Sequence, residues 1–181
     1  MGSPLALPSE VLADAGIVSG MNVVDLCSGD GWFTLQIARV ARHVYAVDID
    51  AKLLEMTRVR LQENGRTNCT YVAADAYDIG KVIAEPVDHV FLANAFHGVP
   101  DKLRLAHVVH GVLKPGGLFA VVNWYARPRE QTRVLGEPRG PATELRIDPA
   151  AISASIVPAG FEIVKTIDVS PHHYAIVYRR S

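Results

Sequence analysis

The stretch Val23–Thr34, Val-Val-Asp-Leu-Cys-Ser-Gly-Asp-Gly-Trp-Phe-Thr, begins as an apolar run and breaks into a glycine turn. The apolar run is typical of a buried strand, and the residues after the turn have the pattern of a helix. Gly29 and Gly31 allow the backbone to approach a ligand where a Cβ atom would clash, and the helix presents unpaired N–H groups at its start. The stretch therefore predicts a loop that holds a nucleotide-type cofactor.

A second apolar run ends in Asp48, roughly 20 residues after the glycine turn. A carboxylate at this place can accept hydrogen bonds from the two hydroxyls of a ribose. A Gly-x-Gly pair alone is weak evidence, because many turns need one. The order strand, turn, helix, strand and terminal acid is stronger evidence for the cofactor.

Short apolar runs alternate with helix-period segments along the whole chain, which predicts an α/β fold. Strands are expected near residues 22–27, 43–48, 69–73, 87–94, 117–124, 161–168 and 173–179, and helices near 9–15, 31–41, 51–63, 101–110 and 149–157. This alternation predicts a three-layer sandwich, a mostly parallel seven-stranded sheet with helices on both faces. Residues 169–172 are too few for a crossover helix, so the last two strands should form a C-terminal antiparallel hairpin.

The composition fits one compact domain that spans residues 1–181, because 49% of the 181 residues are hydrophobic and 20% are charged. A net charge of −1 gives no field that would hold a nucleic acid, so none is expected as a partner. No apolar run approaches the roughly 20 residues of a membrane span, and the first residues lack the pattern of a signal peptide. We therefore expect no membrane partner and a cytoplasmic location. Cys27 and Cys69 are expected to be packed thiols, and no metal site is assigned.

With these motifs the chain resembles the class I S-adenosylmethionine-dependent methyltransferases. Their first motif, Asp/Glu-x-Gly-x-Gly-x-Gly, matches Asp25, Cys27, Gly29 and Gly31, with Cys27 in the place of the first glycine. The later motifs match Asp48, Asp75-Ala76, Asn94-Ala95-Phe96-His97 and Leu113-Lys114-Pro115-Gly116-Gly117-Leu118. If Cys27 packs against the methionine half of the cofactor, its side chain narrows the pocket.

The resemblance implies that S-adenosyl-L-methionine is the cofactor, that S-adenosyl-L-homocysteine is the product, and that a small or medium-sized acceptor receives the methyl group. The cofactor-binding residues that it implies are Asp25, Cys27, Ser28, Gly29, Gly31, Asp48, Ile49, Asp75, Ala76 and Asn94. Two of these acids have simpler interpretations. Asp75 could cap the helix that begins near Tyr77, and Asp25 could stabilise the turn.

A nicotinamide-dependent dehydrogenase is the main alternative for the glycine loop. Its pyrophosphate lies on a helix N-terminus, and its fingerprint needs a third glycine for close helix packing. Thr34 occupies that position. Because S-adenosylmethionine carries no phosphate, a threonine is acceptable in its loop. The terminal hairpin and the Pro-Gly-Gly turn also favour the methyltransferase.

The fourth motif supplies the candidate catalytic residues, Asn94 and His97, beside the place expected for the transferable methyl group. Methyl transfer depends mainly on aligning the acceptor, so a base is optional. His97 could deprotonate a phenol, an amine or a thiol, or it could be a loop histidine that bonds to the backbone. Methyltransferases that act on amino groups of nucleic-acid bases carry two prolines where this chain has Ala95 and Phe96, which argues against such a substrate.

Residues 124–148 have no obvious counterpart in the family and are broken by prolines, so they should form a substrate-side loop rather than a helix. Arginines there could clamp a carboxylate or a phosphate on an anionic small-molecule acceptor. Alternatively, they could pair with Glu130, Glu137 and Glu144 in a solvated loop. The substrate-binding residues that we select are Trp124, Arg139 and Arg146.

Two other functions remain open. A non-catalytic sensor or scaffold would bind S-adenosylmethionine without an acceptor site. A protein or peptide methyltransferase would suit the short N-terminal segment, residues 1–20, which we expect to act as a cap that leaves the acceptor pocket open. A homodimer is compatible with the sequence.

Overall fold

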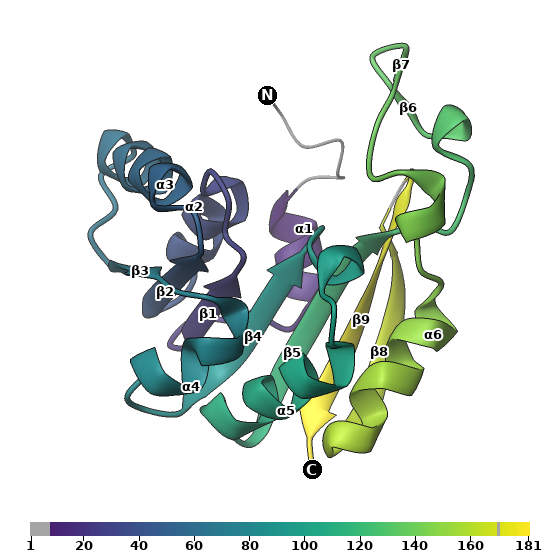
Figure 1. Cartoon of the computed structure of the whole chain (residues 1–181). Coiled ribbons are helices and arrows are strands. Elements are labelled where there is room, and N and C mark those ends of the chain that lie inside the picture. The colour runs from purple at the N-terminus through teal and green to yellow at the C-terminus, as the bar shows by residue number, and fades with distance from the viewer. Residues whose placement is uncertain (1–7, 170) are drawn as a thin grey trace.

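The computed structural model describes residues 8–169 and 171–181, and its centre is a seven-stranded sheet (Figure 1). The strands of this sheet are β1 (Asn22–Leu26), β2 (His43–Asp48), β3 (Cys69–Ala73), β4 (Val87–Ala93), β5 (Leu113–Trp124), β8 (Phe161–Val169) and β9 (His173–Arg180). Their spatial order is β3-β2-β1-β4-β5-β9-β8. The strands β1 to β5 pair in parallel, whereas β9 is antiparallel to both β5 and β8. The expected α/β fold with its C-terminal hairpin is confirmed.

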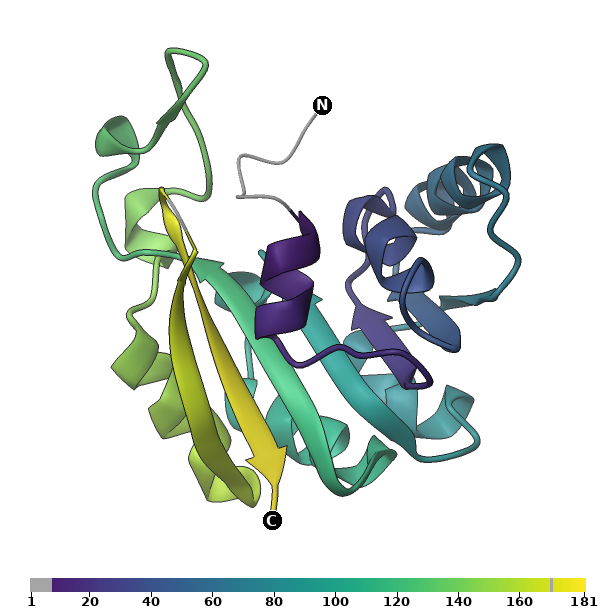
Figure 2. The same ribbon diagram turned by 180° about the vertical axis from the view of Figure 1, so that it is seen from behind.

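Helices cover both faces of the sheet (Figures 1 and 2). They are α1 (Pro8–Asp14), α2 (Trp32–Ala38), α3 (Ala51–Glu63), α4 (Ile79–Val82), α5 (Lys102–Val112) and α6 (Pro149–Ile156). The first three pack into one apolar cluster, and the last three pack into a second cluster on the opposite face. Strand β1 lies between these clusters and is buried along its whole length, as a central parallel strand should be.

Aspartate caps fix where three of the helices begin. The side chain of Asp50 accepts from Lys52 N–H at α3, that of Asp101 accepts from Arg104 N–H at α5, and that of Asp148 accepts from Ala151 N–H at α6. Each cap satisfies an N–H group that has no partner inside the helix. Within residues 8–169 and 171–181, none of the helices has the length and apolarity that crossing a membrane requires.

The structure differs from the expected elements in three places. Strand β5 begins at Leu113, four residues early, because Leu113 pairs with Val87 before the register shifts. The helix α4 has only 4 residues, too few to show a helical period in the sequence. Residues 124–148 contain no α-helix, as expected, but they include a two-stranded ribbon of β6 (Arg133–Val134) and β7 (Glu137–Pro138).

Short 3₁₀ turns join several of these elements. They are η1 (Ala76–Asp78), η2 (Phe96–Gly98), η3 (Arg129–Gln131), η4 (Thr143–Leu145) and η5 (Val157–Ala159). Two of them, η1 and η2, begin three residues after the last residues of β3 and β4. They therefore lie at the carboxyl edge of the sheet, where ligands bind in open α/β folds.

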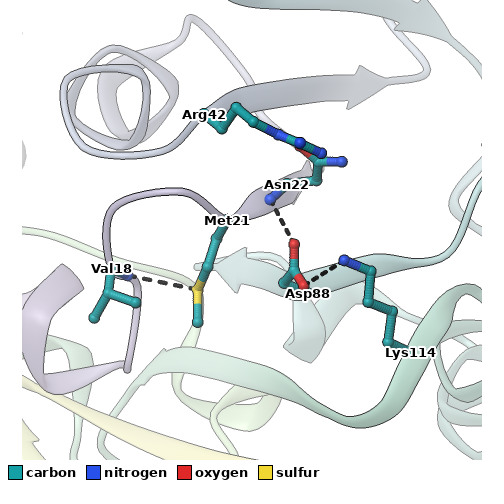
Figure 3. A network of polar contacts seen from close by, with 6 residues as sticks. All are labelled: Val18, Met21, Asn22, Arg42, Asp88 and Lys114. Atoms are coloured by element: carbon teal, nitrogen blue, oxygen red, sulfur yellow. Dashed lines mark hydrogen bonds and ion pairs between the residues drawn. The ribbon is translucent and has the colours of Figure 1, made fainter.

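A polar network ties three parallel strands together at the opposite edge of the sheet (Figure 3). Asp88 of β4 accepts from the backbone N–H of Asn22 at 2.8 Å and from Lys114 Nζ at 2.6 Å. Arg42, which precedes β2, donates from Nε to Asn22 Oδ1 at 3.0 Å. Burial raises the pKa of Asp88, but the hydrogen bonds from Lys114 and Asn22 and the charges of Lys114 and Arg42 outweigh it and hold the pKa below its usual value.

We expect Asp88→Ala to lower the free energy of unfolding by about 1–2 kcal/mol, because the change removes one ion pair and one acceptor for a backbone donor. Urea denaturation measures this loss. The control is Lys81→Met, which breaks an exposed pair with Asp78 at 2.7 Å and should cost less than about 0.5 kcal/mol. Equal losses in the two variants would contradict the role given to Asp88.

The same network has a defined pH dependence. The pKa of Asp88 is lower in the folded chain than in the unfolded one, where it is about 3.9. Its stabilisation is therefore present above about pH 4 and is lost as the pH falls through the folded pKa. The stability difference between the wild type and Asp88→Ala should shrink below about pH 4.

Candidate cofactor and acceptor site

The turn after β1 requires left-handed backbone at three positions. Cys27, Gly29 and Gly31 have φ values of 58°, 56° and 81°. A glycine adopts this conformation without strain, but a side chain does not. Cys27 is therefore a strained residue at the place where the sequence motif has a glycine. Ser28 N–H donates to Val47 O at 3.0 Å and holds the turn against β2.

Glycine is needed at Gly29 and at Gly31 for different physical reasons. A Cβ atom at Gly29 would meet nothing within 4 Å, so this glycine faces open space that a ligand can enter. A Cβ atom at Gly31 would lie 2.7–2.9 Å from atoms of Thr57 in α3. Gly31 is thus needed for close packing between the turn and α3, whereas the sequence led us to expect ligand approach at both positions.

Asp48, at the end of β2, holds the turn in place. Its Oδ2 accepts from Gly29 N–H at 2.8 Å, and its Oδ1 accepts from Asp50 N–H at 2.9 Å. The side chain is 9% exposed. Each carboxylate oxygen has a second lone pair, so both oxygens can still accept from a ligand hydroxyl.

Asp25 is buried beside the turn and is hydrogen-bonded to Thr34, which stands where the dinucleotide-binding fingerprint has its third glycine. Thr34 Oγ1 donates to Asp25 Oδ2 at 2.6 Å, and Asp25 is 2% exposed. Burial raises the pKa of Asp25 to about 7; the Thr34 hydrogen bond lowers it, and the charge of Asp48 raises it further. A cation beside this carboxyl would return it to the ionised form, because an opposite charge favours the charged state.

Two cavities meet at Cys27. The first, of about 300 Å³, is mostly apolar and is lined in part by Asp48, Ile49, Asp75 and Ala76. The second, of about 210 Å³, is lined by residues of the turn and of the β4 end, among them Asp25, Ser28, Gly29, Trp32 and Asn94. Cys27 lines both. Burial is the main cause that raises the pKa of its thiol to about 12, so the thiol stays protonated.

The second cavity carries buried polar atoms that no described residue satisfies. They are Ser28 Oγ, Trp32 Nε1 and Asn94 Oδ1. Buried polar groups in proteins are nearly always hydrogen-bonded, so these three atoms are available to a polar ligand or to water. Asn94 is also left-handed, with φ of 58°. Trp32 was not among the expected site residues, although it follows the glycine turn directly.

Asp75, at the wall of the first cavity, has the capping role that was its simpler interpretation. Its side chain accepts from Tyr77 N–H at 2.8 Å and so caps η1. Asp75 is exposed at the cavity wall, where its carboxylate can still accept from a ligand. Tyr77 also lines this cavity and was not expected to do so. The assignment of Asp75 to a ligand stays a prediction.

His97 lies in η2, after β4, and is half-buried. Its Nδ1 is 3.3 Å from Oδ1 of Asn123, the residue before the end of β5. Burial lowers the pKa of His97; the hydrogen bond to Asn123 raises it, the charges of Lys102 and Arg146 lower it, and the net pKa lies below its usual value. The ring is therefore mostly neutral at pH 7, as a base must be before it acts.

The three residues selected from the 124–148 segment differ in burial. Trp124 and Arg146 are 5% and 8% exposed, and the Arg146 guanidinium lies 5.3 Å from the centre of the Trp124 ring. Arg146 Nη2 donates to Thr132 Oγ1 at 2.8 Å and to the carbonyl of Arg139 at 2.9 Å. These contacts organise the segment from within. Arg139 is exposed at its surface.

The pairing of these arginines with glutamates, which the sequence left open, is not found. Among the described residues, none of the ion pairs joins an arginine of this segment to an acid. Arg129 and Arg133 donate instead to backbone carbonyls, of Gly140 at 3.1 Å and of Gly136 at 2.9 Å. The guanidinium groups thus retain their charge without a carboxylate partner.

Comparison with known proteins identifies the family of the chain. A family model described as a methyltransferase domain matches residues 24–121. The chain is 35% identical over 119 residues to an uncharacterized methyltransferase of Synechocystis sp., which covers 65% of this chain and 52% of the relative. It is 29% identical over 121 residues to the 2-phytyl-1,4-naphtoquinone methyltransferase of Nostoc punctiforme, with the same two coverages. The chain therefore spans about half the length of these relatives.

A solved structure has the same fold. The crystal structure of an S-adenosylmethionine-dependent methyltransferase from Aquifex aeolicus matches 97% of this chain and 90% of its own, with a TM-score of 0.83 and 20% identity. The match of the family model covers the glycine turn, Asp48, Asp75 and the fourth motif. The chain thus belongs to the class I S-adenosylmethionine-dependent methyltransferases.

Proposed function

We propose that this chain transfers a methyl group from S-adenosylmethionine to a small-molecule acceptor. The observation that carries the proposal is the pair of cavities that meet at Cys27, one apolar and one with three unsatisfied buried polar atoms. S-adenosylmethionine has two unlike ends: its nucleoside would match the apolar cavity, and its amino-acid end would match the polar one. When bound, it supplies an activated methyl group on a sulfonium.

The residues present fit both ends of this cofactor. In the apolar cavity, Asp48 and Asp75 would accept from the ribose and the adenine, while Ile49 and Ala76 supply apolar surface. In the polar cavity, Ser28 and Asn94 would bond to the amino-acid end, and Asp25 would face its ammonium group. Burial raises the pKa of Asp25 to about 7, and an adjacent ammonium group would lower it and favour the carboxylate that pairs with that group.

We infer a small-molecule acceptor from one named relative, whereas another relative is named as a protein-L-isoaspartate O-methyltransferase and keeps a protein acceptor as the alternative. The Nostoc relative is named for a naphthoquinone acceptor. In this chain the acceptor would lie between η2 and the 124–148 segment. Arg139 would bind an anionic group on the acceptor, and His97 would serve as the base. Arg146, buried beneath the segment, would hold Trp124 and the Arg139 backbone in position.

We expect Asp48→Ala to weaken S-adenosylmethionine binding tenfold or more, since charged hydrogen bonds contribute about 1.5–3 kcal/mol each. Isothermal titration calorimetry measures the affinity, and Asp78→Ala, which removes a carboxylate outside both cavities, is the control. Circular dichroism confirms that the variant is folded. Unchanged affinity in folded Asp48→Ala would show that the carboxylate does not hold the cofactor.

Cys27 provides a second prediction. Both Cys27→Gly and Cys27→Ala remove the thiol between the cavities and should tighten S-adenosylmethionine binding roughly two- to fivefold. They should differ in stability. Glycine relieves the left-handed strain at φ of 58°, about 1–2 kcal/mol, and adds about 0.5–1 kcal/mol of backbone entropy, so Cys27→Gly should be at least as stable as Cys27→Ala. If both variants and the wild type bind S-adenosylmethionine with equal affinity, the Cys27 side chain does not contact the cofactor.

The two arginines should behave differently when replaced. Arg146→Met removes hydrogen bonds from inside the segment and should lower the free energy of unfolding by about 1–3 kcal/mol. Arg139→Ala should change stability by less than about 0.5 kcal/mol but raise the KM for the acceptor, with unchanged affinity for S-adenosylmethionine. Wild-type acceptor kinetics in Arg139→Ala would end its assignment to the acceptor.

The acceptor itself is found by a screen of phenols, thiols, amines and quinols that monitors S-adenosylhomocysteine. Production that depends on one acceptor class supports the proposed activity. Stoichiometric S-adenosylmethionine binding without acceptor-dependent turnover would instead favour a sensor or scaffold. Turnover with peptides alone would favour a protein methyltransferase.

A further inference from the structure

The contact between His97 and Asn123 determines which ring nitrogen of His97 carries the proton. Asn123 is 1% exposed, and its Oδ1 lies 3.3 Å from His97 Nδ1. The same Oδ1 accepts from the backbone N–H of Trp124 at 3.0 Å. One side-chain atom therefore meets both a fixed backbone donor and a ring nitrogen.

The backbone donor decides how the amide is oriented. An N–H group can only donate, so the Asn123 atom that meets Trp124 N–H must be the carbonyl oxygen. A carbonyl oxygen can only accept, so the ring nitrogen on its other side must carry a proton. His97 is thereby fixed as the Nδ1–H tautomer. A neutral imidazole has a single N–H, so the lone pair lies on Nε2.

Nε2 makes no hydrogen bond within the described part of the chain, and the ring is only half-buried. The amide Nδ2 of Asn123 is buried without a partner among the same residues. The carbonyl end of the amide is the end that meets both Trp124 N–H and the ring of His97.

We propose that Asn123 is a positioning residue that holds His97 as the Nδ1–H tautomer and so presents Nε2 as the general base toward the acceptor. The inference rests on the proposed function, because it gives His97 a task only if an acceptor must lose a proton. In that step the acceptor's X–H bond breaks, its electron pair stays on X, and the proton forms a bond to Nε2. The resulting imidazolium keeps its Nδ1–H on Asn123, in a hydrogen bond that becomes charge-assisted.

The charges around His97 are compatible with this task. Burial is the main cause that lowers the pKa of His97; the hydrogen bond to Asn123 of β5 opposes it, and the charges of Lys102 of α5 and Arg146 lower the pKa further. The neutral base is therefore available at pH 7. The same two cations also favour the anion that the acceptor becomes when it loses its proton.

The first test measures the tautomer directly and needs no acceptor. Nitrogen-15 chemical shifts of the imidazole ring, in uniformly labelled protein above pH 7, distinguish a protonated from a bare nitrogen. We expect Nδ1 of His97 to be protonated and Nε2 to be bare, whereas the exposed His107 serves as the internal reference for an unconstrained ring. A protonated Nε2 in His97 would overturn the proposal.

Two variants of Asn123 separate positioning from packing. Asn123→Asp keeps the acceptor and adds a negative charge, so the ring should remain Nδ1–H and the pKa of His97 should rise by about one unit or more. Asn123→Leu removes the acceptor, so protonated Nε2 should become detectable. An unchanged tautomer in folded Asn123→Leu would refute the proposal; if that variant does not fold, the wild-type spectrum and the Asn123→Asp titration decide.

Activity gives an independent readout once the screen has found an acceptor with an ionisable proton. The acid limb of the kcat/KM profile should move to higher pH in Asn123→Asp, and His97→Gln should lose that limb and at least about 100-fold in kcat. A limb that stays in place in Asn123→Asp would contradict the inference. If no acceptor is methylated, the proposed function fails, but the ring spectra still test the tautomer.

Discussion

The carboxylate of Asp48 is the constraint on which the cofactor side of the molecule depends. Its two oxygens accept from Gly29 N–H and Asp50 N–H, so one side chain joins the glycine turn to the end of β2 and to the start of α3. Both donors are backbone groups that would otherwise lack a partner near the cavities. The turn is consequently shaped by a neighbouring strand as well as by its own sequence.

This arrangement explains why the turn tolerates one strained residue. Thr57 of α3 leaves no room for a side chain at Gly31, and Thr57 Oγ1 donates to the carbonyl of Gly29 at 2.9 Å. The turn is thus fixed from β2 and from α3 at once. Strain of one or two kcal/mol at Cys27 persists only because the surrounding contacts over-determine the backbone. The strained residue lies at the boundary of the two cavities, where a side chain influences both.

Much of the fold and of the cofactor side could be predicted because both follow from local patterns. The apolar runs, the Gly-x-Gly turn and Asp48 lie in adjacent elements of one β-α-β unit, so their spacing fixes their relative positions. Trp32 and Asn123 could not be assigned in the same way. Their importance lies in single polar atoms, Nε1 and Oδ1, whose environment depends on strands far apart in the sequence. The buried position of Arg146 likewise depends on packing against Trp124 and Thr132.

The region that we propose for the acceptor is built on a different principle from the glycine turn. A buried guanidinium usually requires a carboxylate, because an uncompensated charge is costly in a low-dielectric environment. Arg146 instead has Thr132, backbone carbonyls and the face of Trp124. These partners bind Nε and Nη2 without neutralising the charge, whereas Nη1 has no partner among the described residues, and the charges of Arg146 and Lys102 both act on His97. In the function that we propose, these charges would favour an acceptor that is anionic when it reacts, and together with burial they lower the pKa of His97 and so favour its neutral form.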